Sequence, residues 1–267
     1  MRQAAQLIEY ERVARQAATE AGLVLRRQFL RETPIEVESK GLHDFVTAAD
    51  REAEKAAIAV LQRSYPSHTI MSEEAAPEAV SAGFRWIIDP LDGTTNFIHG
   101  VPTFAVSIAL EDPQGLVAGV IHDPNREETF HAHRGGGARL NGARIHCSEP
   151  AGLGDSLLAT GFPFRELSRV KPYLQAFEAF IRTTAGLRRA GSASLDLAYT
   201  ACGRYDGFWE VGLSTWDIAA GALLVREAGG TVTDIVGGNT YLETGDIVAA
   251  GPQLHQKMLE ITRAAFA

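Results

Sequence analysis

The sequence predicts a mixed protein of α+β and α/β character, and three observations support this fold class. Residues 4–31 have apolar side chains at helical spacing, with Ile8, Val13 and Ala17 on one face. The first half then carries short strand-like runs and turn signals such as Asn141-Gly142, which are typical of antiparallel strands. The second half alternates strand-like with helix-like segments, as α/β proteins do.

The remaining elements follow in chain order. A second helix is predicted at about residues 45–65, because Thr47 and Asp50 have capping-box spacing near its start. Strands are predicted at 69–71, 85–88, 104–110, 116–122, 128–133, 157–160, 207–210 and 247–250, and further helices at 166–184, 192–202 and 215–228. Since no linker-like or repetitive stretch divides the chain, residues 1–145 are predicted to form an α+β half and residues 146–267 an α/β half of one compact unit.

Composition and charge restrict the class of function. The 267 residues are 45% hydrophobic and 22% charged, as in ordinary globular proteins. Lys and Arg number 25 and Asp and Glu 33, and the net charge of −8 disfavours direct binding to nucleic acid or to an anionic membrane. No apolar run approaches the roughly 18 residues of a membrane span, and the charged N-terminal segment does not resemble a signal peptide. Two cysteines, Cys147 and Cys202, do not make a disulfide framework, so a cytoplasmic location is predicted.

The most informative motif is residues 86–97. An apolar run ends in Asp89, which places a carboxylate at the carboxyl end of a buried strand. Asp92 follows three residues later, so a turn can direct both carboxylates to one point. Two carboxylates this close repel each other unless a cation lies between them, and ligands that are all oxygen atoms favour a hard ion such as Mg²⁺. Gly93-Thr94-Thr95 then offers backbone N–H groups at a helix start, where a phosphate group can bind.

Two alternatives apply to this motif. Asp, Pro and Gly favour surface turns, but a plain surface turn would not require the buried strand before it. Haloacid-dehalogenase-type phosphatases carry Asp-x-Asp-Gly-Thr with a nucleophilic first Asp, whereas this chain has Asp-x-x-Asp-Gly-Thr. The added residue changes where Asp92 points, which favours attack by a metal-held water over a phosphoaspartate mechanism.

Three further carboxylates have weaker local signals. Glu73 follows the predicted strand 69–71 and would be a third carboxylate at a strand end, although such Glu pairs are most often solvated. Helix capping alone is sufficient to explain Asp50. Asp217 has capping-box spacing after Ser214, so it either caps its helix or brings one more carboxylate to the site from the second half.

Other candidate motifs have simpler explanations. His131-x-His133 could be a metal-binding pair, but a solvated strand face is the favoured interpretation. Arg188-Arg189 could bind phosphate, but in so acidic a chain it is predicted to form ion pairs at a subunit or helix contact. Gly135-Gly136-Gly137 lacks the spacing of a dinucleotide-binding loop and is predicted to be a turn.

Taken together, these segments resemble the inositol monophosphatase family. Residues 89–97 are similar to its first signature, and residues 216–221 with 227–230 are similar to its second. The two motifs occur in the expected order, and the resemblance spans nearly the whole chain. Segments most similar to the bacterial extragenic-suppressor type of this family are Lys40-Gly41, residues 161–164 and residues 196–199. Ser72 departs from the Gly that many members have before the Glu.

The resemblance implies the layered α-β-α-β-α sandwich of the inositol monophosphatase and fructose bisphosphatase superfamily, in a homodimer. It implies hydrolysis of a small phosphorylated polyol, foremost myo-inositol 1-phosphate, with two or three Mg²⁺ ions per site and inhibition by lithium. The implied metal ligands are Glu73, Asp89, the carbonyl of Leu91, Asp92 and Asp217. Asp50, Glu73 and Thr94 are the implied catalytic residues, with Asp50 and Thr94 positioning the attacking water. Phosphate would bind Gly93, Thr94 and Thr95, and substrate hydroxyls would meet Asp92, Ala193, Glu210 and Asp217.

The resemblance leaves two matters open. Fructose bisphosphatases, nucleotide 3′-phosphatases and histidinol phosphatases share the same signatures, so the sequence does not decide the substrate. The bacterial branch is also associated with antitermination of ribosomal RNA transcription, which makes RNA polymerase or antitermination factors further candidate partners. The sequence has no separable motif for that second role.

Overall fold

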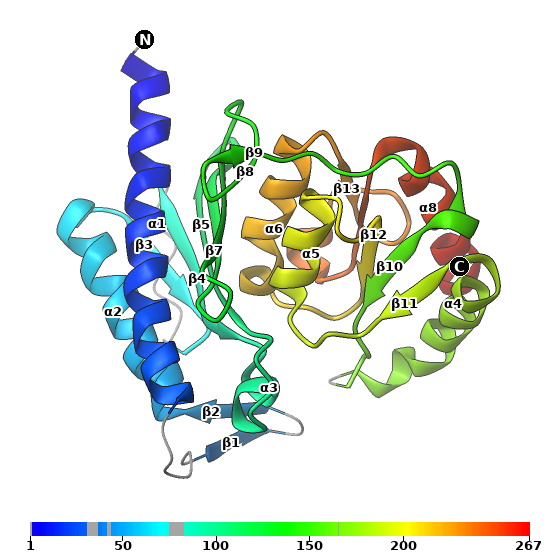
Figure 1. Ribbon diagram of the computed structural model, residues 1–267, viewed down its shortest axis with the longest axis horizontal. Helices are drawn as coiled ribbons and strands as arrows, with labels where there is room; N and C mark the ends of the chain where they lie inside the picture. Colours follow the sequence, from blue (N-terminus) through cyan, green and yellow to red (C-terminus); the bar gives the residue numbers. More distant parts are fainter. Residues whose placement is uncertain (1, 31–36, 42–43, 75–82, 165) are drawn as a thin grey trace.

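The fold is a stack of five layers in the order α-β-α-β-α (Figure 1). The computed structural model describes residues 2–30, 37–41, 44–74, 83–164 and 166–267. The helices are α1 (Arg2–Phe29), α2 (Ala48–Ser64), α3 (Thr94–Ile98), α4 (Val170–Thr183), α5 (Ala193–Ala201), α6 (Thr215–Glu227), α7 (Tyr241–Thr244) and α8 (Pro252–Phe266), with short 3-10 helices η1 (Leu153–Asp155) and η2 (Leu167–Arg169). This is the layered sandwich that the resemblance implied.

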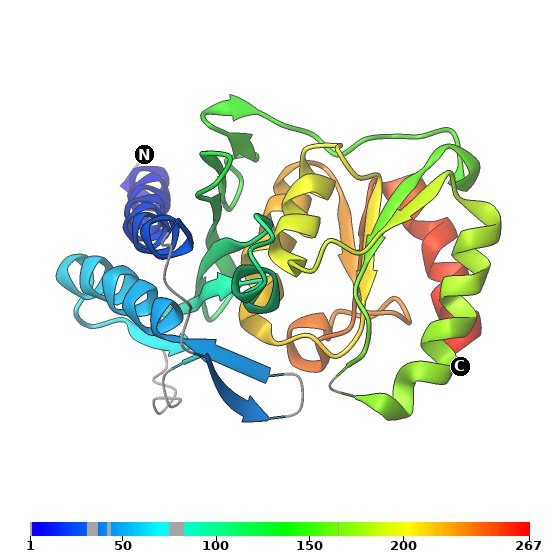
Figure 2. The same cartoon turned by 60° about the horizontal axis from the view of Figure 1, so that its bottom comes forward.

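The first sheet has seven strands in the order β3-β4-β5-β6-β7-β8-β9. They are β3 (Thr69–Ser72), β4 (Arg85–Asp92), β5 (Ala105–Asp112), β6 (Gly115–Asp123), β7 (Glu128–His133), β8 (Arg139–Leu140) and β9 (Ala143–Arg144). Only β3 and β4 pair in parallel; the other pairs are antiparallel, as predicted for this half. Asn141 and Gly142 form the turn of the last hairpin with positive φ values of 49° and 86°, which confirms that turn signal. Helices α1 and α2 cover the outer face of this sheet (Figure 2).

The second sheet has five strands in the order β11-β10-β12-β14-β13. They are β10 (Leu157–Thr160), β11 (Gly186–Arg188), β12 (Gly207–Glu210), β13 (Thr231–Thr233) and β14 (Ile247–Ala250). Strand β10 pairs in parallel with β11 and β12, and β14 pairs antiparallel with β12 and β13. Helices α4 and α8 cover its outer face.

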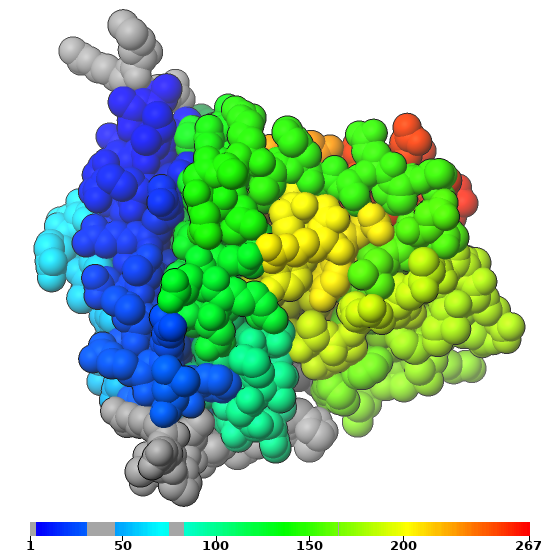
Figure 3. Space-filling model, viewed as in Figure 1, coloured from blue at the N-terminus to red at the C-terminus, as the bar shows by residue number. Residues whose placement is uncertain are grey.

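Helices α5 and α6 lie between the two sheets and form the central layer (Figure 1). The backbone of α6 comes so close to β6 that a Cβ at Gly119 would lie 2.9 Å from the carbonyl oxygen of Ala220. On the surface, Arg204 directly after α5 hydrogen bonds to both carboxylate oxygens of Glu128 on β7, at 2.6 and 2.5 Å. On the face shown in Figure 3, the region of β7–β9 lies between α1 (blue) and α5 (yellow).

The structure corrects several predicted boundaries. Residues 44–47 form strand β2, which pairs with β1 (Val37–Gly41), so the second helix starts at Ala48 and not at residue 45. The helix predicted from residue 166 starts at Val170, since Pro172 has no N–H group and is tolerated only in a first helical turn. Helix α1 ends at Phe29; residue 31, the last predicted position, lies outside the described residues. Helix α3 begins at Thr94, which confirms the helix start predicted at residues 93–95, whereas β11, β13, α7 and α8 were not predicted. No helix of the described segments is long and apolar enough to cross a membrane. The division at residues 145 and 146 stays a prediction.

The interpretation of His131 and His133 as a solvated strand face was wrong. His131 is 2% exposed, and its Nδ1 lies 2.6 Å from Oε1 of Glu11 on α1. Nδ1 of His133 contacts the other oxygen of the same carboxylate. The two rings share one buried carboxylate because α1 lies across β7 and covers this end of the sheet.

Candidate active site

A β-bulge in β4 brings Asp89 and Asp92 together. In a regular strand, residues three apart point to opposite faces of the sheet. Here Asp89 pairs with Ser107 and Asp92 with Ala105, so three steps along β4 oppose two steps along β5. The extra residue returns Asp92 to the side of Asp89. The sequence had suggested that the strand ends at Asp89, whereas β4 continues through the bulge to Asp92.

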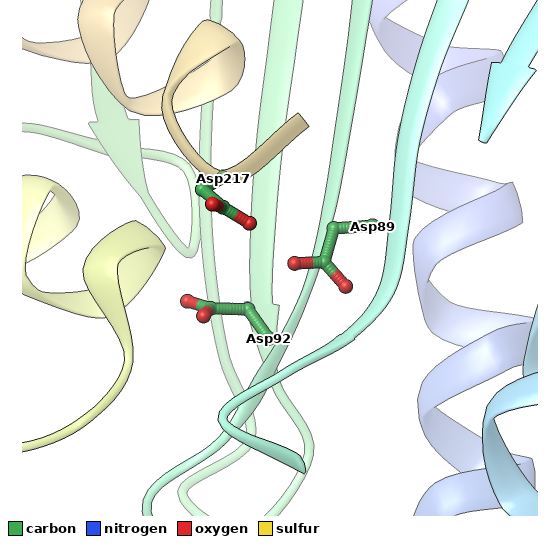
Figure 4. A group of neighbouring side chains, drawn as sticks. All are labelled: Asp89, Asp92 and Asp217. Carbon is green, nitrogen blue, oxygen red and sulfur yellow. The ribbon is translucent and has the colours of Figure 1, made fainter. Parts of the chain in front are cut away.

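Asp217 reaches the same point from the second half of the chain. It lies in the first turn of α6, where its Oδ2 accepts a hydrogen bond of 2.8 Å from the backbone N–H of Ser214. Ser107, the pairing partner of Asp89, donates a hydrogen bond of 3.1 Å to the carbonyl oxygen of Trp216. This bond holds the start of α6 against β5. One carboxylate oxygen each from Asp89, Asp92 and Asp217 lie within 4.8 Å of one another (Figure 4).

Glu73 approaches this cluster through the parallel pairing of β3 and β4. Ser72 pairs with Ile88, and the backbone N–H of Glu73 donates a hydrogen bond of 3.2 Å to the carbonyl of Ile88. The residue after Ile88 is Asp89, so the two acidic residues are neighbours. Burial raises the pKa of Asp89 well above its usual range, and the charges of Glu73, Asp92 and Asp217 raise it further. An all-oxygen cluster with this mutual repulsion has the chemistry that a hard divalent cation fits.

Asp50 has two roles in the structure. Its Oδ2 accepts hydrogen bonds from the backbone N–H and the hydroxyl of Thr47, at 2.8 and 2.6 Å, which confirms the predicted capping box. Its Oδ1 lies 3.4 Å from the hydroxyl of Thr94, which also donates a bond of 3.0 Å to the carbonyl of Leu91. Capping therefore accounts for only one of the two oxygens of Asp50.

Gly93 permits the turn that follows Asp92. Its φ is +94°, and a Cβ there would lie 2.9 Å from the carbonyl oxygen of Thr103, so a side chain is excluded by both conformation and space. Helix α3 begins directly after it, and the backbone N–H groups of the first helical turn have no partner within the helix. Thr94 and Thr95 are the first two residues of that turn.

The start of α5 holds Asp92 from the second half. Oδ2 of Asp92 accepts hydrogen bonds from Ser192 Oγ at 2.6 Å, from Ser194 N at 2.7 Å and from Ser194 Oγ at 2.5 Å. Burial raises the pKa of Asp92, while the hydrogen bonds from the two serines act in the opposite direction. No role was predicted for these serines. Ser192 lies in the segment Gly191-Ser192-Ala193, whose position before the second signature of the family is the signal that could have indicated it.

The remaining pocket wall comes from β12 and from the loop after β10. Glu210 ends β12, and its carboxylate occupies the space where a Cβ at Gly161 would lie. Arg189, for which ion pairs at a subunit or helix contact were predicted, lines the pocket, and its guanidinium lies over the rings of Phe162 and Phe164, 5.4 Å from each centroid.

A single pocket collects nearly all residues that the sequence singled out. The predicted site residues that line it are Glu73, Asp89, Leu91, Asp92, Gly93, Thr94, Thr95, Ala193, Glu210 and Asp217. Asp50 is not among these lining residues but contacts Thr94, which is. Residues that hold the site and were not predicted are Ser107, Ser192 and Ser194. The structure brings these residues together, and their roles stay predictions.

Comparison with known proteins agrees with this geometry. Residues 6–266 match the sequence model of the inositol monophosphatase family. The chain belongs to this family. Members are metal-dependent phosphatases, and the acidic cluster is of the kind that could bind a metal.

Relatives within the inositol monophosphatase family are similar over almost their whole length. The Nus factor SuhB of Pseudomonas aeruginosa is 50% identical over 252 residues, which cover 92% of this chain and 93% of that protein. The crystal structure of the extragenic suppressor protein suhB from Bartonella henselae superposes with a TM-score of 0.90 at 43% identity, covering 94% of this chain and 97% of that one. The inositol monophosphatase of Anabaena superposes with a TM-score of 0.87 at 37% identity and 97% coverage of both chains.

Proposed function

We propose that this member of the family hydrolyses a small phosphate monoester with Mg²⁺ as its cofactor, and that myo-inositol 1-phosphate is its substrate. The observation that carries the proposal is the convergence of Asp89, Asp92 and Asp217 beside the glycine turn at Gly93. The carboxylates that could hold a cation and the residues at the start of α3, whose first backbone N–H groups have no partner within the helix, line the same pocket.

The proposed metal ligands all supply oxygen. They are Glu73, Asp89, Asp92, Asp217 and the carbonyl of Leu91, and they would hold two or three ions. Mg²⁺, when bound, would lower the pKa of water, neutralise phosphate oxygens and stabilise the leaving alkoxide. The raised pKa of Asp89 supports this assignment, because a cation would remove the repulsion that the neighbouring carboxylates cause.

The chain's own groups would position the reactants. Asp50 Oδ1 and the Thr94 hydroxyl lie 3.4 Å apart and would orient an attacking water, with Asp50 as the proton acceptor. Glu73 would be the third catalytic residue. Backbone N–H groups of Gly93, Thr94 and Thr95 would bind the phosphate oxygens. Phosphoryl transfer depends on this kind of positioning more than on covalent catalysis.

The substrate's polyol would lie toward the second half of the pocket. Ala193 at the start of α5, Glu210 at the end of β12, Asp92 and Asp217 all line the pocket. We propose that these four residues meet the substrate's hydroxyl groups.

A panel of phosphate monoesters tests the proposal. Phosphate release should be fastest from myo-inositol 1-phosphate, compared with fructose 1,6-bisphosphate, a nucleotide 3′-phosphate and histidinol phosphate. Release should stop when Mg²⁺ is removed and return when it is added back. Activity that persists after exhaustive chelation would contradict the metal assignment. Faster release from another ester would mean that this other ester, and not myo-inositol 1-phosphate, is the preferred substrate. Ca²⁺ should inhibit, because its looser coordination does not suit the reaction, and lithium should inhibit too.

A second candidate function rests on the relatives. Proteins up to 50% identical to this chain are named Nus factor SuhB, so we also propose a non-catalytic role in transcription antitermination. Pull-down of RNA polymerase and its factors with wild-type and Asp92→Asn protein tests it. Equal recovery by both proteins would support a second function independent of catalysis, and no recovery by either would remove it.

Two further properties belong to the same proposal. We propose that the protein is cytoplasmic, as its two cysteines suggest, and that it forms a homodimer, as the family resemblance implies. Light scattering on the purified protein at several concentrations would show whether the mass is twice the 28.8 kDa of the chain.

A further inference from the structure

Asp196 is a buried acid inside the pocket to which the proposed mechanism gives no role. It lies in the first turn of α5, a helix whose residues are all buried, and it is 1% exposed. It nevertheless lines the same pocket as Asp92, Glu210 and Asp217. Its helix begins with the serines that hold Asp92, so its position is fixed relative to the acidic cluster.

The carboxyl group of Asp196 is poorly satisfied. Within the described parts of the chain, its Oδ1 has no hydrogen-bond partner. Buried polar groups are nearly always hydrogen-bonded, and each exception needs an explanation. Burial raises the pKa of Asp196 well above its usual range, and the nearby charges of Glu210 and Asp92 raise it further while Arg189 acts in the opposite direction.

Another buried acid of this chain shows the contrast. Asp234 is 5% exposed, and its Oδ1 accepts hydrogen bonds from the backbone N–H groups of Val236 and Gly238, at 3.0 and 2.8 Å. Its Oδ2 accepts a bond of 2.7 Å from the hydroxyl of Thr240. An acid with a purely structural role is thus saturated with donors in this fold, whereas Asp196 is not.

The charges of the pocket indicate which ligand group would complete Asp196. The carboxylates of the described lining are Glu73, Asp89, Asp92, Glu166, Asp196, Glu210 and Asp217, and the one cation of that lining is Arg189. A second anionic group on the substrate would be repelled by the acids on this side, which the proposed metals do not neutralise. A neutral hydroxyl can donate to a carboxylate or accept from a carboxylic acid, so it fits Asp196 in either state.

We infer that Asp196 is a further substrate-binding residue, which hydrogen bonds to a hydroxyl group of the polyol part of the substrate. This rests on the proposed phosphatase function and narrows its substrate class to monophosphates with a neutral, hydroxyl-bearing body. Asp196 lies on α5 beside Ala193 and facing Glu210, so the three would surround the polyol. The buried carboxyl of such a residue lacks a hydrogen-bond partner in the free protein and gains one when the substrate binds.

Asp196→Leu tests this inference by two measurements. The ratio of kcat/KM for myo-inositol 1-phosphate to kcat/KM for p-nitrophenyl phosphate should fall about tenfold or more, because only the first substrate offers hydroxyls. The melting temperature of the substrate-free protein in EDTA should rise by about 2–4 °C, because an unsatisfied buried carboxyl has been removed. The Mg²⁺ concentration for half-maximal rate should stay as in wild type. Asp234→Leu is the matched control and should lower the melting temperature.

The outcomes separate this inference from the proposed function. If Asp196→Leu does not fold, Asp196→Ala removes both carboxyl oxygens with a smaller side chain and should give the same fall in the ratio. A fall of fivefold or more in the ratio supports the inference, and a smaller change overturns it. If the wild type hydrolyses neither ester, the proposed function fails. In that case the inference is tested by the rise in melting temperature that myo-inositol 1-phosphate with Mg²⁺ causes. A rise in wild type that is lost in Asp196→Ala supports the inference, and a rise of equal size in both proteins, or no rise in wild type, overturns it.

Discussion

The hydroxyl of Ser192 lies 2.6 Å from Oδ2 of Asp92, although 100 residues separate the two along the chain. Ser194 adds two hydrogen bonds to the same oxygen. The start of α5 therefore fixes the orientation of a carboxylate at the bulge of β4. Since Asp92 is a proposed metal ligand, these serines would act on the metal through it.

Replacing both serines should weaken metal binding while leaving the ligands in place. In Ser192→Ala/Ser194→Ala, the Mg²⁺ concentration for half-maximal rate should rise by about 10-fold or more, because the groups that orient metal ligands have effects of that size. The measurement is the rate as a function of Mg²⁺. Ser156→Ala, which removes another fully buried serine hydroxyl that bonds to the carbonyl of Gly152, is the control. An unchanged Mg²⁺ dependence in the double variant would show that the serines serve only stability.

Asp92→Asn should abolish turnover and leave the fold intact. The change removes one negative charge from the cluster with Asp89 and Asp217 and keeps the shape of the side chain. A loss of at least about 10²-fold in kcat is expected, comparable to the loss of one preorganised electrostatic contact. Circular dichroism checks the fold, and Glu73→Gln should behave in the same way. Near-normal turnover at saturating Mg²⁺ would refute the ligand assignment.

Asp217 needs a test that separates a role in helix capping from a role in catalysis, because its carboxylate also accepts a hydrogen bond from the backbone N–H of Ser214. Asp217→Asn should lower kcat by at least about 10²-fold. Ser214→Ala, which changes the N-cap residue but keeps the carboxylate, should lower the free energy of unfolding by about 1 kcal/mol with little effect on turnover. If Asp217→Asn lowers the free energy of unfolding but has little effect on turnover, Asp217 only caps its helix.

Much of the site was predictable because its residues are close in sequence. The run before Asp89, the three-residue spacing to Asp92 and Gly93 after it are features of one short segment. The order of strands and helices also followed from hydrophobic periodicity, as the confirmed strands β3 to β7 show. Local patterns of this kind are set by the chain itself and need no knowledge of tertiary contacts.

What the sequence could not predict depends on contacts between distant segments. Asp89 and Asp92 share one face only because of the bulge opposite β5, and Asp217 joins them only because Ser107 holds the start of α6. His131 was taken for a solvated residue because its partner, Glu11, lies 120 residues away. A capping box explains Asp50 locally, and only the fold shows Thr94 beside its second oxygen.

Glu210 should determine substrate preference more than metal binding. Glu210→Ala should lower kcat/KM for myo-inositol 1-phosphate about tenfold more than for p-nitrophenyl phosphate, because a polyol-reading carboxylate discriminates by its hydrogen bonds. Gly161→Ala offers a second variant, since the added Cβ would displace the Glu210 carboxylate without removing it. Gly161→Ala should also lower kcat/KM more for myo-inositol 1-phosphate than for p-nitrophenyl phosphate. Equal losses on both substrates, or a change confined to the Mg²⁺ requirement, would contradict the role of Glu210.

The contact of Glu11 with His131 and His133 should make stability depend on pH. Burial alone would raise the pKa of Glu11, but hydrogen bonds and charge from the two histidines outweigh it and lower the pKa from 4.5 to about 2. A carboxylate whose pKa is lower in the folded protein stabilises the fold above its unfolded pKa. That contribution is lost as the pH falls from about 4.5 toward 2.

Glu11→Gln removes this contribution and should lower the free energy of unfolding at pH 7 by about 2 kcal/mol, the usual worth of hydrogen bonds to a charged group. Denaturant unfolding of both proteins at pH 7, 5.5, 4.5 and 3.5 measures the difference. The difference in the free energy of unfolding should stay constant down to about pH 4.5. Below that pH it should become smaller, because Glu11 then takes up a proton in the unfolded wild-type chain and its carboxylate no longer favours the folded state as strongly. Glu9→Gln is the control, since Glu9 is a half-exposed residue of the same helix that pairs only with Arg12 among the described residues. If the difference in the free energy of unfolding between Glu11→Gln and wild type stays constant to pH 3.5, Glu11 stabilises the fold by packing and not by its charge.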